Sequence, residues 1–203
     1  TPLYSSAASD VYKRQAKALW LNYPNNPTGA IAGGEFFEEV VAFARKHDVP
    51  VLHDAPYTEV SYDGYKPMSF LEIPGAKEVG VEFHSLSKSY NMTGWRIGYA
   101  GGPKEIIKAM AKLQSQSTSN PSSISQAAAL EALESSDDFL IKRNEQFKTR
   151  RDMVVSNLNE CKGINCDLPA GAFYVFPDFS LYMGDNYKIK SFYITYKFYS
   201  IVF

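Results

Sequence analysis

SLSKSYNMTGWRIGY, residues 85–99, is the stretch of this 203-residue chain that decides its fold. An apolar run at 79–84 precedes it and predicts a buried strand, and the run at 95–100, closed by Gly-Gly-Pro, predicts another. Earlier apolar runs at 18–23 and 49–53 predict two further strands. Strands that recur along a chain with helical segments between them are typical of a parallel sheet covered by helices.

Helical patterns lie between and after these strands. Residues 35–46 place several apolar side chains on one face of a helix. Further helices are predicted at 104–113, 123–133 and about 137–159, and a last strand at 172–176. We therefore expect an α/β fold in which helices sandwich a mostly parallel sheet, followed by the beginning of a smaller α/β domain.

The same patterns divide the chain into four parts. We predict a non-native or disordered leader at 1–16, a large-domain portion at 17–135, a long connecting helix with the start of a small domain at 136–180, and a tail of uncertain character at 181–203. The leader has no clear period, and the tail is a crowded run of Tyr, Phe and Ile with interspersed Lys.

Composition excludes several classes of function. The formal net charge is −1, whereas an electrostatic nucleic-acid binder needs a basic surplus. No stretch approaches the roughly 20 apolar residues of a membrane span. The only two cysteines, Cys161 and Cys166, are too few for a disulfide framework and lack a nearby partner pair for zinc. We expect ordinary thiols in a reducing cytoplasm, no metal, no nucleic acid and no membrane.

Reactive side chains follow three of the predicted strands. The first strand runs into NNPTG at 25–29, the second into DAPY at 54–57, and the third into SLSK at 85–88, with GWR at 94–96 shortly after. Ligands of open α/β sheets collect at the carboxyl ends of the strands. We therefore expect these four segments to meet at one edge of the sheet.

Each segment taken alone has a simpler explanation. Asn-Pro-Thr-Gly could be only a turn, and Asp54 could cap the segment that follows it. Lys88 could be a solvated surface lysine, and Arg96 could pair with a carboxylate. The combination of an acid, a phenol, an amide, hydroxyls, an amine and a guanidinium at one edge favours a common ligand.

Four of these side chains suit a substituted pyridine ring. Asp54 can keep a ring nitrogen protonated, which lets the ring accept electrons. Tyr57 and Asn26 can donate to a ring oxygen, and the Lys88 amine can bond to an aldehyde carbon. Arg96, Ser85 and Ser87 can bind a phosphate group. Pyridoxal 5'-phosphate is the ligand that needs all of these groups together.

The motifs NNPTG, DAPY and SLSKSYNMTGWRIGY resemble the class I and II aminotransferases of fold type I in order and spacing, over roughly residues 17–180. The resemblance implies the same roles: Lys88, Asp54 and Tyr57 catalytic, with Lys88 in a Schiff base with the cofactor. It implies cofactor contacts from Asn26, Asp54, Tyr57, Ser85, Ser87, Lys88 and Arg96. Ser119-Asn120-Pro121 is similar to a family segment that reaches the partner's active site, which implies a homodimer.

Two subgroups of the family compete. The segment from His53 to Lys88 is similar to LL-diaminopimelate aminotransferases, whereas residues 101–133 look more like bacterial aspartate aminotransferases. A hybrid enzyme and a chimeric chain both stay open. The implied substrates are an aspartate- or diaminopimelate-like L-amino acid and a 2-oxo acid such as 2-oxoglutarate.

The family also uses residues that this sequence does not show. The arginine that binds the substrate α-carboxylate is expected in the small domain, and no arginine follows Arg151. We therefore expect this polypeptide to be a truncated portion that is inactive or a poor catalyst alone. Two alternatives remain: a lyase or decarboxylase on the same cofactor, and a non-catalytic effector-binding domain of a transcription regulator.

Overall fold

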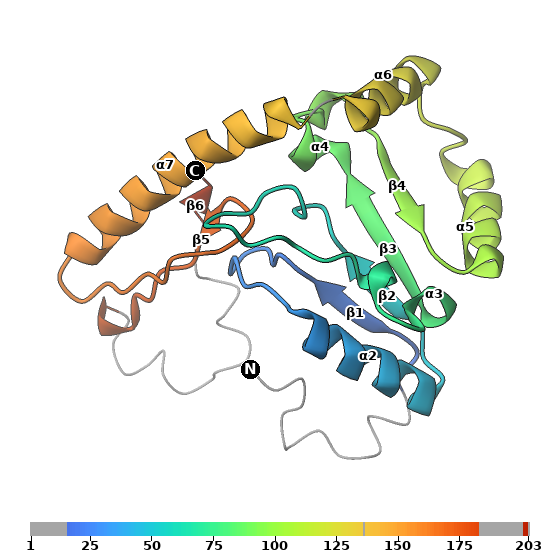
Figure 1. The fold of residues 1–203 in the computed structure, drawn as a ribbon, viewed down its shortest axis with the longest axis horizontal. Helices are drawn as coiled ribbons and strands as arrows, with labels where there is room; N and C mark the ends of the chain where they lie inside the picture. The colour runs from blue at the N-terminus through green and yellow to red at the C-terminus, as the bar shows by residue number, and fades with distance from the viewer. Residues whose placement is uncertain (1–15, 136, 183–200, 203) are drawn as a thin grey trace.

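A four-stranded sheet forms the centre of the protein. The computed structural model describes residues 16–135 and 137–182 together with the backbone of residues 201–202 (Figure 1). The strands lie side by side in chain order as β1 (Leu19–Asn22), β2 (Val51–Asp54), β3 (Gly80–Ser85) and β4 (Gly98–Gly101). The first three strands are parallel, and β4 is antiparallel to β3. The predicted α/β class with a mostly parallel sheet is confirmed.

The direction of β4 follows from the short connection before it. Only the helix α4 (Leu86–Ser89) and the 3-10 turn η2 (Thr93–Trp95) lie between β3 and β4. A return to a parallel strand needs a longer crossover across one face of the sheet. The prediction that a strand begins at residue 95 was wrong, because η2 and the left-handed backbone of Arg96, with φ of 52°, delay it to Gly98.

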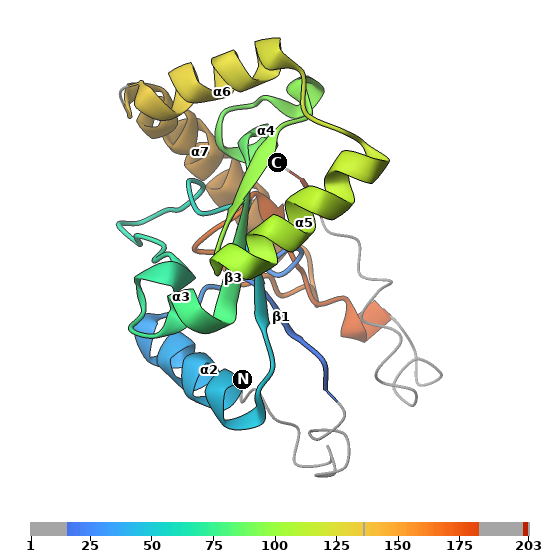
Figure 2. The ribbon, with the colours of Figure 1, turned by 90° about the vertical axis from the view of Figure 1, so that its right-hand side faces the viewer.

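The predicted helices are present with slightly different ends. They are α2 (Gly34–His47), α5 (Lys104–Ser117), α6 (Ser123–Glu134) and α7 (Asp138–Glu160). A short helix, α3 (Ala76–Val79), was not predicted. Figure 2 shows α2 and α3 on one side of the sheet and α5 on the other. None of these described helices is long and apolar enough to cross a membrane.

Burial is deepest between α2 and the sheet. Phe37, Val40, Val41 and Ala44 repeat at the three- and four-residue spacing of one helix face, and all four are buried. They pack against Leu21 of β1, Val51 of β2 and Phe70. The opposite face is covered less completely: Trp20 of β1 is 63% exposed, and α5 has no buried residue.

The end of the chain is described in part. The strand predicted at 172–176 is reduced to β5 (Tyr174–Val175), which pairs in antiparallel fashion with β6 (Ile201–Val202). Most of the predicted leader at 1–16 and of the predicted tail at 181–203 lies outside the described residues.

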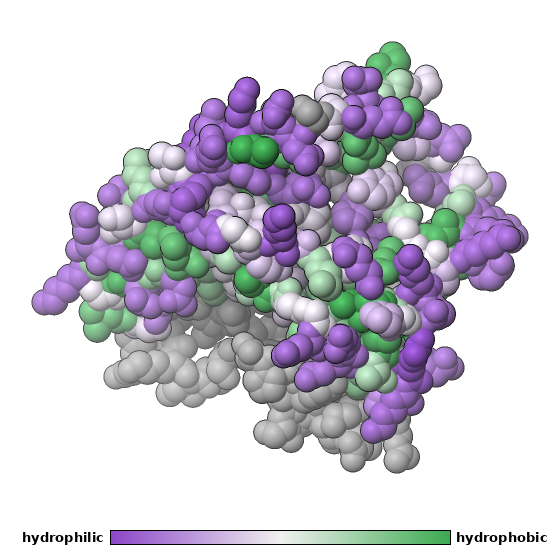
Figure 3. All heavy atoms as spheres, in the orientation of Figure 1, coloured by the Kyte–Doolittle hydropathy of each residue, from purple (hydrophilic) through white to green (hydrophobic). Residues whose placement is uncertain are grey.

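Hydrophilic residues dominate the visible surface over α5 and α7 (Figure 3), so these helices present polar faces there.

A cluster of ionisable side chains, centred on the buried Glu82, links β2 and β3. Glu82 of β3 is 1% exposed and accepts hydrogen bonds from the Ser69 hydroxyl at 2.7 Å and the Phe70 amide at 2.6 Å. Its carboxylate also contacts His53 Nδ1 at 2.9 Å and His84 Nε2 at 2.7 Å. Burial alone would raise the pKa of Glu82, but the hydrogen bonds from His53, His84 and Ser69 lower it well below its ordinary value of 4.5.

Glu82→Gln should reduce the free energy of unfolding at pH 7 by about 3 kcal/mol, because it leaves buried donors without their charged acceptor. Folding lowers the pKa of Glu82, so its carboxylate stabilises the fold above pH 4.5 and loses this effect as the pH falls further. Urea unfolding between pH 3 and pH 7 measures both effects.

The matched control is Glu78→Gln, which removes an exposed ion pair with Arg45. That variant should lose less than about 1 kcal/mol. Equal losses of unfolding free energy in the two variants would contradict the role assigned to the buried carboxylate. So would a fall in stability between pH 7 and pH 3 that is the same in Glu82→Gln and in the unsubstituted protein.

Candidate active site

Asn22, the last residue of β1, organises the turn that carries Asn26. Its amide nitrogen donates to the Asp54 carbonyl oxygen at 2.8 Å, and its amide oxygen accepts from the Asn26 backbone nitrogen at 2.7 Å. Asn25 then binds the Thr28 hydroxyl at 2.6 Å, and Gly29 completes the turn with φ of 69°. The NNPTG segment is therefore a true turn, and that turn also sets Asn26 beside the end of β2.

Asp54 is the last residue of β2 and is half-buried. One of its carboxylate oxygens lies 3.4 Å from the Asn22 amide nitrogen. Burial raises the pKa of Asp54, and the neighbouring His53 partly opposes that shift. Asp54 does not cap a helix of the described chain, since residues 56–59 form a turn.

Tyr57 lies in the turn at 56–59 that follows β2, and it is 3% exposed. Its hydroxyl oxygen lies 3.4 Å from the Asn26 amide nitrogen and 2.6 Å from the Tyr174 hydroxyl. Burial and the hydrogen bond with Tyr174 raise the pKa of Tyr57 far above its usual range, and the charge of Asp54 adds to this shift. These effects favour the protonated phenol over the phenolate.

Lys88 lies on α4 and is half-buried. The Ser85 hydroxyl begins this helix by accepting from the Ser87 backbone nitrogen at 3.3 Å. The Lys88 amine lies 5.5 Å from the centre of the Phe173 ring, and the Tyr57 ring packs against the same ring at 5.4 Å. Lys88 and Tyr57 therefore border one aromatic side chain.

A buried arginine holds the backbone below Lys88. Arg143 of α7 is 6% exposed and donates to the carbonyl oxygens of Lys88 at 3.2 Å and Glu59 at 2.5 Å. Because one guanidinium joins the helix that carries Lys88 to the loop after Tyr57, it fixes the two segments relative to each other.

Arg96 lies at the edge of this group. Its side chain is exposed and donates to the Thr93 carbonyl oxygen at 2.9 Å, while the Thr93 hydroxyl donates to the Ser87 carbonyl oxygen at 3.2 Å. Arg96 also lines an open hollow of about 550 Å³ with residues of α5 and α6. The backbone next to Arg96 is joined to the segment of Lys88 by the hydrogen bond from the Leu86 amide to the Ile97 carbonyl oxygen at 3.3 Å.

Sequence reasoning missed four residues of this region: Asn22, Arg143, Phe173 and Tyr174. Asn22 ends a predicted strand directly before NNPTG, which is a signal that could have been used. Phe173 and Tyr174 come from the GAFYVF segment, whose position beside Tyr57 depends on tertiary packing.

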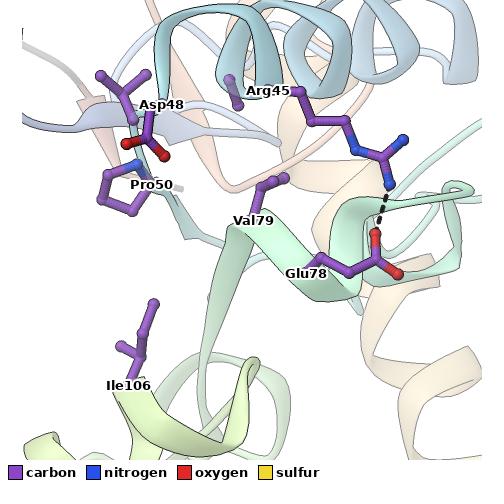
Figure 4. A pocket seen from close by; sticks show the side chains of 8 residues that line it. Arg45, Asp48, Pro50, Glu78, Val79 and Ile106 are labelled. Atoms are coloured by element: carbon purple, nitrogen blue, oxygen red, sulfur yellow. Dashed lines mark hydrogen bonds and ion pairs between the residues drawn. The ribbon is translucent and has the colours of Figure 1, made fainter.

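A second hollow, of about 440 Å³, lies at the other end of the sheet (Figure 4). Residues that precede β2 and β3 line it, including Val49, Pro50 and Val79, and the exposed Arg45–Glu78 ion pair borders it at 2.5 Å. It is therefore separate from the polar residues at the carboxyl ends of the strands. Among the described residues, no group of His, Cys, Asp and Glu side chains is placed to hold a metal ion.

The donor set fits a pyridine ring with an aldehyde, a ring oxygen and a phosphate. Asp54 offers an acid, Tyr57 and Asn26 offer neutral donors, and Lys88 offers an amine beside an aromatic ring. The exposed guanidinium of Arg96 keeps donors beyond the one used by Thr93. This arrangement can bind an electron-accepting ring and place an amine next to its aldehyde.

Comparison with known proteins identifies the family of this chain. The family model of class I and II aminotransferases matches residues 3–194. The LL-diaminopimelate aminotransferase of Syntrophobacter fumaroxidans is 47% identical over 174 residues, which are 86% of this chain and 44% of that protein. The one from Dehalococcoides mccartyi strain CBDB1 is 49% identical over 161 residues, 79% of this chain and 41% of that protein.

Solved structures of other proteins are also similar to this chain. The aspartate aminotransferase from Rhizobium meliloti is 46% identical with a TM-score of 0.76, over 79% of this chain and 41% of that chain. Substrate-bound BacF from Bacillus subtilis is 36% identical with a TM-score of 0.79, over 84% of this chain and 43% of that chain. The chain spans less than half the length of each of these relatives. It belongs to the family of class I and II aminotransferases.

Proposed function

We propose that this chain is the cofactor-binding portion of a pyridoxal-phosphate-dependent aminotransferase. The observation that carries the proposal is the connected set formed by Asn26, Asp54, Tyr57 and Lys88 at the carboxyl ends of parallel strands. Membership of the aminotransferase family supports the reaction class. The set combines the acid, the donors and the amine that such a cofactor needs.

Each residue would hold a different part of pyridoxal phosphate. Asp54 would face the ring nitrogen, and Tyr57 and Asn26 would donate to the ring oxygen. Lys88 would bond to the aldehyde carbon. Ser85, Ser87 and Arg96 would bind the phosphate, for which a guanidinium and hydroxyl groups are suited. When bound, the cofactor supplies an electron sink for charge that develops on the substrate.

The protein's own groups perform the proton transfer. After the substrate amine displaces it, the Lys88 amine would take the proton from the substrate α-carbon as general base. The carboxylate of Asp54, which β2 and Asn22 hold in place, would keep the ring nitrogen protonated by its negative charge. Arg143 would keep Lys88 in reach by holding its backbone.

The substrates proposed are an aspartate- or diaminopimelate-like L-amino acid and a 2-oxo acid such as 2-oxoglutarate, with a homodimer as the assembly. Relatives that are LL-diaminopimelate aminotransferases and a similar aspartate aminotransferase structure support this range. The division of the chain into a large-domain portion at 17–135 and the start of a small domain at 136–180 stays a prediction.

Lys88→Ala should abolish the visible absorption that pyridoxal phosphate gains on bonding to a lysine of the protein. The reason is that Lys88 is the amine beside the Phe173 ring, which packs against the Tyr57 ring. Absorption spectra of the purified chain with added cofactor measure the effect. Lys142→Ala, which changes an exposed lysine of α7, should keep the full band. A band that survives in Lys88→Ala would exclude Lys88 as the attachment site.

Asp54→Asn should leave the cofactor bound at Lys88 but slow removal of the substrate α-proton by about 100-fold or more, because the ring nitrogen loses its charged partner. Stopped-flow spectra of the full-length enzyme that carries this portion, after addition of L-aspartate, L-glutamate or LL-diaminopimelate, measure this step. The control is Asp48→Asn, an exposed site at the far end of the sheet, which should keep the rate.

The products of that reaction separate the competing activities. Transamination releases one 2-oxo acid for each cofactor converted, whereas ammonia or carbon dioxide would favour a lyase or a decarboxylase. Equal rates in Asp54→Asn and the unsubstituted protein would contradict the role given to Asp54.

A further inference from the structure

Resting on the proposed function, we infer that Tyr174 is a positioning residue whose hydroxyl donates to Tyr57 when Tyr57 donates its own proton to the ring oxygen of the cofactor. Among the proposed cofactor-binding residues, Tyr174 contacts only Tyr57 in the described contacts. It acts through Tyr57, 117 positions earlier in the chain.

The contact between the two tyrosines is close and enclosed. Their hydroxyl oxygens are 2.6 Å apart, and the side chains are 3% and 7% exposed. Their rings pack edge to face, with centroids 5.5 Å apart and planes at 83°. Because both side chains are buried, water competes little for the contact between the two hydroxyls.

Either hydroxyl can donate to the other within this pair, so a third group decides which way the protons point. A tyrosine hydroxyl has one proton and two acceptor positions. The Asn26 amide nitrogen, which can only donate, lies 3.4 Å from the Tyr57 oxygen and uses one acceptor position. When a third group takes the single proton of Tyr57, the contact between the two hydroxyls is kept by Tyr174 donating to the second acceptor position of Tyr57.

That third group is the ring oxygen that the proposed function places here. A negatively charged oxygen is a strong acceptor, and a donor that already accepts two hydrogen bonds is polarised to give its own proton more strongly. The chain Tyr174 to Tyr57 to ring oxygen therefore strengthens the Tyr57 contact. It also ties β5 to the loop after β2, so the site depends on the segment at 136–180.

The inference predicts a shift in the pH titration of the visible band. Donation from Tyr57 withdraws negative charge from the ring oxygen, which then holds the proton shared with the Lys88 nitrogen less firmly. Tyr174→Phe weakens that donation, so the band should titrate at a pH higher by about half to one unit. Tyr57→Phe should shift it further in the same direction.

A double variant tests whether Tyr174 acts through Tyr57. Tyr57→Phe/Tyr174→Phe should titrate like Tyr57→Phe alone, because Tyr174 has no route to the cofactor once the Tyr57 hydroxyl is gone. The matched control is Tyr62→Phe, a tyrosine that is 3% exposed and whose hydroxyl donates to the Ala172 carbonyl oxygen at 2.7 Å. It should leave the titration unchanged.

A second substitution reverses the sign without removing the hydroxyl. Incorporation of 3-fluorotyrosine at position 174 gives a more acidic, stronger donor and should move the titration of the band to lower pH. This variant keeps the shape of the side chain, so it tests the inference even when Tyr174→Phe fails to fold, which circular dichroism checks.

The outcomes separate this inference from the proposed function. Absence of a Lys88-dependent band in the unsubstituted protein overturns both. A normal band whose titration is unaffected by Tyr174→Phe and by the fluorinated side chain overturns the inference alone. Shifts that add in the double variant also overturn it, since Tyr174 would then act independently of Tyr57.

Discussion

The pairing of Asn22 with Asp54 is the constraint on which the candidate site depends. The two residues face each other across the parallel strands β1 and β2, and the Asn22 amide binds the Asp54 backbone while accepting from Asn26. A shift of the pairing by one residue would turn Asp54 to the opposite face of the sheet. One side chain thus fixes the strand register, the following turn and the direction of the acid together.

The aromatic cluster of Tyr57, Phe173 and Tyr174 joins distant parts of the chain at the same place. Phe173 lies between the Lys88 amine and the Tyr57 ring, and Arg143 of α7 holds the backbone of Lys88. The segments that follow the strands of the four-stranded sheet therefore supply the reactive groups, while residues from α7 and β5 hold them in position. This division explains why the motifs alone describe an incomplete site.

The sequence predicted much of the fold because apolar periodicity reports burial directly. The four apolar residues of α2 and the strand ends before Asn26 and Asp54 were predictable for this reason. The direction of β4 was not, because it depends on the length of a connection rather than on the strand itself. Tyr174 and Arg143 were also missed, since their partners lie 117 and 55 positions away and local patterns carry no information on such contacts.

A crystal structure of the protein with pyridoxal phosphate tests the central claim most directly. We expect a bond between the Lys88 nitrogen and the aldehyde carbon, the Asp54 carboxylate within hydrogen-bond distance of the ring nitrogen, and the Tyr57 hydroxyl at the ring oxygen. Cofactor bound through another lysine, or an Asp54 carboxylate on the face of the sheet away from the ring, would contradict the account.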